Sequence, residues 1–239
     1  MTLDDEQIQF YREQGHLVAP ALFDAATVRQ MIEHYMKLRA EGPKPGDFGG
    51  TNDRPDDLTQ KYPRMINMHQ WDAKSRQWAS NLDLLAAVQA LINDKPVLHQ
   101  TMMYFKPPGG RGQGLHQDQQ YITIDPLIGA WLALDPADKD VGQMTVVSGS
   151  HRLGMLKVES ADPLVSFTPV QATLPQGSTE MGVDMNPGDV LFFDGKLVHG
   201  SYPNITPDRW RRSFICHFVG QHATKFQPPQ GTHVSHLKH

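Results

Sequence analysis

Cysteine is almost absent from this sequence, and long apolar runs are missing altogether. A single cysteine, Cys216, excludes an internal disulfide and is typical of a reducing compartment. No apolar stretch is long enough to span a bilayer, and residues 1–16 carry neither the apolar core of a signal peptide nor the Arg-rich pattern of a transit peptide. We therefore expect a cytoplasmic protein without a membrane partner, in which Cys216 is a small buried residue on a strand.

Positive charge is also scarce. The 239 residues include 22 Lys and Arg against 26 Asp and Glu, a net charge of -4, and no basic run or aromatic–basic stripe is present. Nucleic acid is therefore not an expected partner, which leaves a small-molecule substrate, and the sequence does not specify an oligomeric state. Twelve histidines are more than usual for this length. Four of them lie in a segment that we expect to be a solvated tail: His222, His233, His236 and His239.

The first part of the chain is predicted to be mostly helical. Asp4 is suited to cap a helix that ends at Gly15, and Asp24 is suited to cap a second helix that ends at Gly42. The last convincing helical pattern covers residues 82–92. Residues 42–62 are dense in Gly, Pro, Asp and Asn, which predicts a long loop that is either a lid or an irregular excursion.

After Pro96 the pattern changes to short β-like runs separated by Pro/Gly turns. Helices followed by many short strands favour a mainly β fold with flanking helices, a sandwich or jelly roll. We expect one domain over 1–239, with a helical flank and loop (1–95), a β core (96–220) and a tail (221–239). The core includes an irregular insert at 154–182 with one or two strands. The predicted strands are 97–105, 121–124, 128–134, 143–147, 190–193 and 211–219.

Three residues form a candidate metal-binding set. His116 and Asp118 are two residues apart, so on an extended backbone both side chains leave the same face. Alone, such a pair is more often a hydrogen-bonded surface pair. His199, which follows a Pro-Gly-Asp turn and an apolar strand, offers a third ligand. Two imidazoles and one carboxylate on one face of an ion leave positions open, which suits iron(II) oxygen chemistry better than a closed structural zinc site.

A strand that begins with Arg211-Arg212-Ser213 follows His199 after one loop. A guanidinium and a serine hydroxyl beside a metal would bind the distal carboxylate of a cosubstrate, because lysine cannot reproduce the bidentate fork of arginine. Without the histidines, the same residues would be read as an exposed basic strand end.

Taken together, these motifs resemble the phytanoyl-CoA dioxygenase (PhyH-like) family of iron(II)/2-oxoglutarate oxygenases. The resemblance covers roughly residues 97–219 and implies a double-stranded β-helix, or cupin-like jelly roll. It implies that His116, Asp118 and His199 bind iron(II), that Arg211 and Ser213 hold 2-oxoglutarate, and that O₂ is the second cosubstrate. The motifs that carry it are Phe105-Lys106-Pro107-Pro108-Gly109, Leu115-His116-Gln117-Asp118, Ala130-Trp131, Ser148-Gly149-Ser150-His151, Pro187-Gly188-Asp189 and His199-Gly200-Ser201 with Asn204.

The resemblance also implies a lining for the cosubstrate pocket. The family usually has one residue fewer between the last histidine and the arginine, which leaves Arg209 and Arg212 as alternatives. Strand parity separates Arg212 from Arg211, and the Arg-x-Ser pairing selects Arg211. The other cosubstrate residues that the resemblance implies are Gln100, Tyr104, Lys106, Trp131 and Ser201.

The sequence indicates the substrate less directly. The expected contacts are polar and aromatic, which favours hydroxylation of a small polar metabolite or natural-product intermediate, with release of succinate and CO₂, over an acyl-CoA. The same site could serve desaturation, epimerisation or ring closure. A non-catalytic metal-binding jelly roll and a zinc hydrolase are alternatives of other classes, although a hydrolase would not need Arg211 and Ser213. The expected substrate contacts are Asn67, His69, Gln117 and Gln119, with Arg64, Trp71 and the 42–62 loop.

Overall fold

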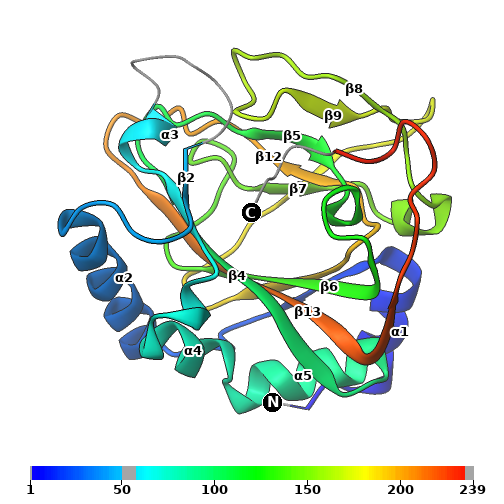
Figure 1. Cartoon of the computed structure of the whole chain (residues 1–239), viewed down its shortest axis with the longest axis horizontal. Coiled ribbons are helices and arrows are strands. Elements are labelled where there is room, and N and C mark those ends of the chain that lie inside the picture. The colour runs from blue at the N-terminus through cyan, green and yellow to red at the C-terminus, as the bar shows by residue number, and fades with distance from the viewer. Residues whose placement is uncertain (1, 50–57, 235–239) are drawn as a thin grey trace.

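Two antiparallel β-sheets face each other across the interior of the protein (Figure 1). The computed structural model describes residues 2–49 and 58–234. The larger sheet has the strand order β1-β11-β6-β13-β4-β3-β2 and the smaller sheet has the order β10-β7-β12-β5. This arrangement confirms the predicted mainly β jelly roll with flanking helices.

The bounds of the strands follow the predicted runs over most of the core. The larger sheet contains β1 (His16–Ala19), β2 (Asp47–Phe48), β3 (Arg64–Ile66), β4 (Pro96–Lys106), β6 (Ile124–Ala133), β11 (Val190–Asp194) and β13 (Arg211–Lys225). The smaller sheet contains β5 (Gln113–His116), β7 (Met144–Val146), β10 (Met181–Val183) and β12 (His199–Ser201), and a separate hairpin pairs β8 (Val158–Ser160) with β9 (Val170–Ala172). The hairpin and the start of β10 lie within the predicted insert at 154–182.

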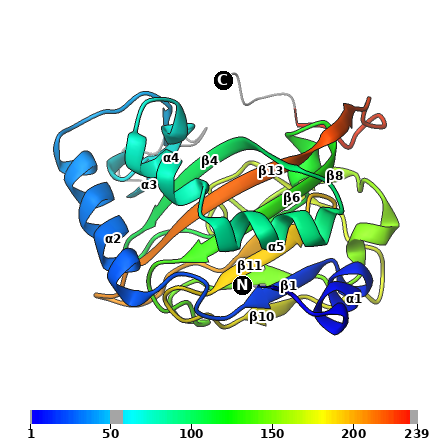
Figure 2. The same ribbon diagram turned by 90° about the horizontal axis from the view of Figure 1, so that it is seen from below.

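Helices cover the outer face of the larger sheet (Figure 2). The first helix is capped by Asp4, whose carboxylate accepts from the Gln7 N–H, and ends at Gly15 with a φ of 78°. Asp24 caps the second helix, as predicted. Among the described residues, no helix is long and apolar enough to cross a membrane. The helices are α1 (Asp5–Gln14), α2 (Ala25–Ala40), α4 (Ala73–Ala79) and α5 (Leu82–Ile92), with the short α3 (Leu58–Lys61) beside β2.

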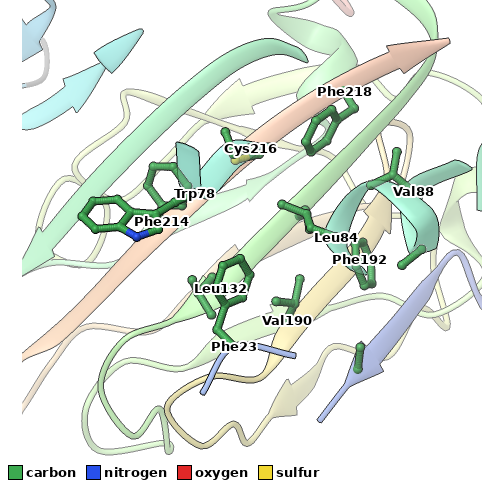
Figure 3. Packing of buried hydrophobic residues seen from close by; sticks show 14 of the residues in the cluster. Phe23, Trp78, Leu84, Val88, Leu132, Val190, Phe192, Phe214, Cys216 and Phe218 are labelled. Carbon is green, nitrogen blue, oxygen red and sulfur yellow. The ribbon is translucent and has the colours of Figure 1, made fainter. Parts of the chain in front are cut away.

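Alternation along β13 separates the hydrophobic core from the cavity between the sheets. Phe214, Cys216 and Phe218 point toward the helices and pack with α5 and β11 residues (Figure 3). Cys216 is buried, as expected, and burial raises the pKa of its thiol. The intervening residues Ile215 and His217 face the cavity. The period of two therefore places apolar packing on one face of the strand and functional side chains on the other.

The predicted strand at 121–124 is wrong. A 3₁₀ turn, η2 (Asp118–Gln120), occupies the preceding residues, and β6 begins only at Ile124. The Tyr121 and Ile122 N–H groups both donate to the Asp118 carbonyl, which closes the turn. Residues 121–124 therefore do not form the predicted strand despite their β propensity, because they follow a turn that presents Asp118 to the cavity.

Other differences lie in segments with weak periodicity. Helix α4 and strand β3 were not predicted, and the described part of the 42–62 loop contains β2 and α3. Residues 50–57, on which the lid prediction partly falls, lie outside the described residues. The predicted tail needs correction, because 221–225 continue β13, and Thr224 and Lys225 pair with Asp125 and Ile124 of β6. His222 and His233 are exposed, whereas His236 and His239 lie outside the described residues.

The turn before β11 depends on Gly188, which has a φ of 97°. A Cβ there would lie 2.2 Å from the Phe23 carbonyl oxygen, whereas Gly177 has a φ of 85° with no atom within 4 Å of such a Cβ. Gly188→Ala should lower the free energy of unfolding by about 2–4 kcal/mol and Gly177→Ala by only about 1 kcal/mol, because only the first adds a backbone clash to the left-handed strain. Urea denaturation measures both, and equal losses would contradict this account.

Candidate metal centre and cosubstrate site

Three side chains from three elements meet at one point between the sheets. His116 ends β5, Asp118 begins η2 and His199 begins β12, and the two histidines are directly paired across the β5–β12 ladder. Asp118 Oδ1 lies 3.6 Å from Nε2 of each histidine. All three residues are at least nine-tenths buried. They form a group that could hold a metal ion, with the ligand atoms all within 4.8 Å of one another.

Backbone carbonyls fix the tautomers of both histidines. His116 Nδ1 lies 2.9 Å from the Gly114 carbonyl oxygen, and His199 Nδ1 lies 3.0 Å from the Leu197 carbonyl oxygen. Because a carbonyl only accepts, each Nδ1 carries the hydrogen and each Nε2 directs a lone pair at the shared point. Burial and the neighbouring His116 lower the pKa of His199 to about 4, against the opposing effect of Asp118. His199 is therefore neutral at pH 7, the form that binds metals.

The Asp118 carboxylate divides its two oxygens between different partners. Oδ2 lies 2.8 Å from His217 Nε2, and Oδ1 faces the two other imidazoles. Burial alone would raise the pKa of Asp118, but His217, His199 and His116 hold it well below its ordinary value. One carboxylate oxygen and two imidazole nitrogens on one face suit iron(II) with open positions, so the residues fit the metal that the family resemblance implies.

A second cluster, of buried basic side chains, includes Arg211 in the lining of the same cavity and Lys106 beside it. Arg211 Nε donates to the Gly142 carbonyl at 3.1 Å, Nη1 donates to Ser213 Oγ at 3.1 Å, and the guanidinium lies 5.3 Å from the Trp131 ring centre. Lys106 is the register partner of Arg211 across β4 and β13, and its Nζ donates to Ser201 Oγ at 2.9 Å. The structure therefore brings together five of the residues that the resemblance implied.

The charges of Arg211 and Lys106 are not neutralised locally. Burial lowers the pKa of Arg211 to about 10, and burial together with Arg211 lowers the pKa of Lys106 well below its ordinary value. Neither side chain forms an ion pair with a carboxylate of the described residues. Two buried cations without a counter-ion disfavour the free protein electrostatically, so a bound carboxylate would offset that cost.

The alternative arginines are occupied elsewhere. Arg212 makes two hydrogen bonds to the Asp135 carboxylate through Nε and Nη2, on the opposite face of β13 from Arg211. Arg209 pairs with Asp138 at 2.6 Å in an exposed position. The structure therefore supports the choice of Arg211 that strand parity and the Arg-x-Ser spacing indicated.

A cavity of about 420 Å³ connects the metal-binding group with Arg211. Gln100, Tyr104, Trp131 and Ser201 line it, while Lys106 contacts Ser201 at its margin. The lining is more apolar than the sequence indicated. The other apolar and aromatic side chains around it are Phe48, Met102, Tyr121, Ile122, Met144, Phe167, Pro169, Val170, Phe193, Ile215 and Val234.

The structure does not bring Gln117 and Gln119 to the cavity, although both were expected to contact substrate. Gln117 Nε2 donates to the carbonyls of Gly154 and Lys196, and its Oε1 accepts from the Leu156 N–H. Gln119 Nε2 donates to the Ile124 carbonyl and to Asp125. Both glutamines have no exposed surface, so they hold the loops around the metal-binding turn.

The other expected substrate contacts divide between the cavity and its surroundings. Asn67, His69 and Trp71 do not line the cavity, and His69 Nδ1 lies 3.0 Å from Thr101 Oγ1. Arg64 does line it and donates to Tyr104 Oη at 2.9 Å. Its guanidinium lies 4.5 to 5.5 Å from the ring centres of Phe48, Tyr104 and Phe167.

Sequence reasoning missed two residues at the metal-binding group. His217 could have been found from the period of β13, because it shares the face of Arg211 and Ser213. Gln113 Nε2 lies 3.0 Å from His116 Nε2, a contact within β5 at the point where the register between β5 and β12 shifts. No spacing rule in the sequence signals that contact.

Comparisons with known proteins agree with this geometry. The sequence model of the phytanoyl-CoA dioxygenase (PhyH) family matches residues 11–213. The chain therefore belongs to the phytanoyl-CoA dioxygenase (PhyH) family. It is 25% identical over 240 residues to phytanoyl-CoA dioxygenase 1 of Oryza sativa subsp. japonica, covering 86% of this chain and 85% of that protein.

Solved structures that share the fold include SnoN and EvdO2. The epimerase SnoN, in complex with Fe3+, alpha ketoglutarate and nogalamycin RO, superposes with a TM-score of 0.76 at 18% identity, over 93% of this chain and 86% of SnoN. EvdO2 from Micromonospora carbonacea var. aurantiaca, complexed with 2-oxoglutarate, superposes with a TM-score of 0.76 at 19% identity, over 96% of each chain. At these identities the likeness shows a common fold.

The His217 contact with Asp118 predicts a measurable loss of iron affinity. In His217→Ala, Asp118 Oδ2 loses its donor and the carboxylate can rotate, so we expect iron(II) to bind about 10–100-fold more weakly. His217→Gln keeps an N–H donor and should recover most of the affinity. Anaerobic competition with a fluorescent chelator measures the three proteins, with thermal melting as the check on folding. Wild-type affinity in a folded His217→Ala protein would contradict the positioning role.

Proposed function

We propose that this chain is an iron(II)- and 2-oxoglutarate-dependent oxygenase that acts on a small molecule. The observation that carries the proposal is the placement of two complementary sites on one cavity. One is the His116, Asp118 and His199 group, and the other is the buried Arg211 with Ser213. A dicarboxylic 2-oxo acid can satisfy both, with one end chelated at the metal and the distal carboxylate on the arginine.

Each part of the site has a separate task. His116, Asp118 and His199 would hold the iron, and His217 positions the Asp118 carboxylate by a hydrogen bond to Oδ2. Arg211 and Ser213 would orient 2-oxoglutarate, with the Trp131 ring supporting the guanidinium. When bound, the iron supplies O₂ activation coupled to oxidation of the 2-oxo acid to succinate and CO₂. The apolar lining excludes water and places one substrate bond beside the metal.

The buried cations argue against the other classes of function. A zinc hydrolase needs two histidines, a carboxylate and water, but it has no use for a buried arginine in the cavity lining or for the buried lysine beside it. A metal-storage jelly roll would also gain nothing from the uncompensated charges of Arg211 and Lys106. Binding of a cosubstrate carboxylate accounts for the presence of both Arg211 and Lys106.

The cavity limits the substrate to a small molecule with a largely apolar body. A volume of about 420 Å³ must hold both the cosubstrate and the reacting part of the substrate. Its aromatic and aliphatic lining favours a ring system or hydrocarbon with few polar groups, of the natural-product type. Hydroxylation is the outcome that we propose first. Epimerisation is one alternative, which the name of SnoN suggests. Hydroxylation of an acyl-CoA is a second alternative, which the name of the rice relative suggests.

Arg211 gives the proposal a direct test. Arg211→Lys removes the bidentate fork, so we expect 2-oxoglutarate to bind about 10–100-fold more weakly while iron(II) affinity is unchanged. Arg212→Lys, on the opposite face of β13, is the matched control and should keep cosubstrate affinity. Anaerobic calorimetry of the iron-loaded proteins measures both. Undiminished 2-oxoglutarate affinity in Arg211→Lys would show that Arg211 does not bind the distal carboxylate of the cosubstrate.

A further inference from the structure

A segment that follows the residues matched by the family model folds back toward the cavity. After β13, residues 226–234 leave the larger sheet and return beside the hairpin β8–β9, as the red end of the chain shows in Figure 1. We call residues 226–234 the carboxyl-terminal strap. The family model ends at residue 213, so the strap lies outside the part of the chain that defines the family.

Three backbone hydrogen bonds attach the strap to the rest of the protein. The Phe226 N–H donates to the Thr123 carbonyl at 3.1 Å. The Val158 N–H donates to the Gly231 carbonyl at 3.0 Å, which ties the strap to strand β8. The Val234 N–H donates to the Gln120 carbonyl at 3.0 Å. The strap therefore bridges the insert and the turn η2, which also presents Asp118.

The side chain of Val234 belongs to the cavity wall. Val234 lines the cavity together with Pro169 and Val170 of the insert and Ile122 beyond η2. These residues come from three separate segments, and each contributes an apolar surface. His233, the neighbour of Val234, is exposed. The strap thus presents one apolar side chain to the compartment that contains the metal-binding group.

The strap is attached weakly compared with the sheets. Among residues 226–234 only Thr232 is buried, and its hydroxyl donates to the Pro229 carbonyl within the strap itself. A segment with few buried side chains and few hydrogen bonds opens at low free energy. Opening it would expose the compartment without moving His116, Asp118 or His199, which are held by other contacts.

We propose that the carboxyl-terminal strap is the removable wall of the substrate compartment and that Val234 contacts the apolar body of the substrate. The proposal rests on the oxygenase function proposed above and adds how the substrate is enclosed. The strap opens to admit the substrate, and its return excludes water from the metal and completes an apolar wall. Val234 is in this view a residue that determines specificity, not one that binds iron or 2-oxoglutarate.

Thiol reactivity tests whether Val234 lies inside the compartment. Cys216 is buried with a raised thiol pKa, so a new cysteine is the only reactive thiol. Val234→Cys should react with iodoacetamide about tenfold more slowly than the matched control His233→Cys, because Val234 is half-buried against the cavity whereas His233 is exposed. Equal reaction rates for the two variants would overturn the placement of Val234 in the cavity wall. Any compound that stimulates 2-oxoglutarate turnover should slow the reaction of Val234→Cys further, and stimulation without protection would overturn the substrate contact.

Shortening the chain tests the strap as a cover. A protein ending at Lys225 should lose iron from its 2-oxoglutarate complex to a bulky chelator at least about tenfold faster than the full chain. Its equilibrium affinities for iron(II) and 2-oxoglutarate should stay within about threefold, and a control ending at Val234 should behave as the full chain. An unchanged rate of iron loss would overturn the proposal. Failure of the full chain to form any iron–2-oxoglutarate complex would instead refute the proposed function, and a shortened protein that fails to fold leaves the thiol measurement as the deciding test.

Discussion

The buried carboxylate of Asp118 is the group on which the rest of the site depends. A lone carboxylate at this depth would be protonated or unstable, and three surrounding histidines instead hold its pKa low. That arrangement requires β5, β12 and β13 to meet around one turn. The cross-strand pairing of His116 with His199 and the glutamines that brace η2 supply this convergence. The jelly roll is thus the frame that brings one negative charge and two imidazole lone pairs to a point.

The cavity is electrostatically divided. One part of its lining carries the carboxylate and imidazoles that suit a cation, and another carries Arg211, which suits an anion, with Lys106 bonded to Ser201 at the margin. A molecule with a chelating 2-oxo acid at one end and a carboxylate at the other matches both parts. Between them the lining is apolar, so the remaining space suits the body of a small substrate. The fold, the family and the two charged parts of the lining therefore point to the same chemistry.

Much of this could be read from the sequence, because local rules govern the elements concerned. Asp4, Asp24 and Gly15 mark helix ends by capping, and the alternation of β13 predicts that Arg211 and Ser213 share a face. The errors arise where tertiary contacts decide. Residues 121–124 have strand propensity but follow a turn, and Gln117 looks like a pocket residue although its amide holds three backbone groups. The strap approaches the site through long-range folding that no local pattern encodes, and the Gln113 contact depends on an irregular register between β5 and β12.

The most direct test of the account is an anaerobic titration of the metal-free protein with iron(II) and then 2-oxoglutarate, followed by visible absorption. We expect the weak charge-transfer band of a chelated 2-oxo acid to appear with one equivalent of each, and to be absent in His199→Ala. Iron that binds tightly at this site without producing the band would contradict the central claim and favour a hydrolytic or non-catalytic metal protein.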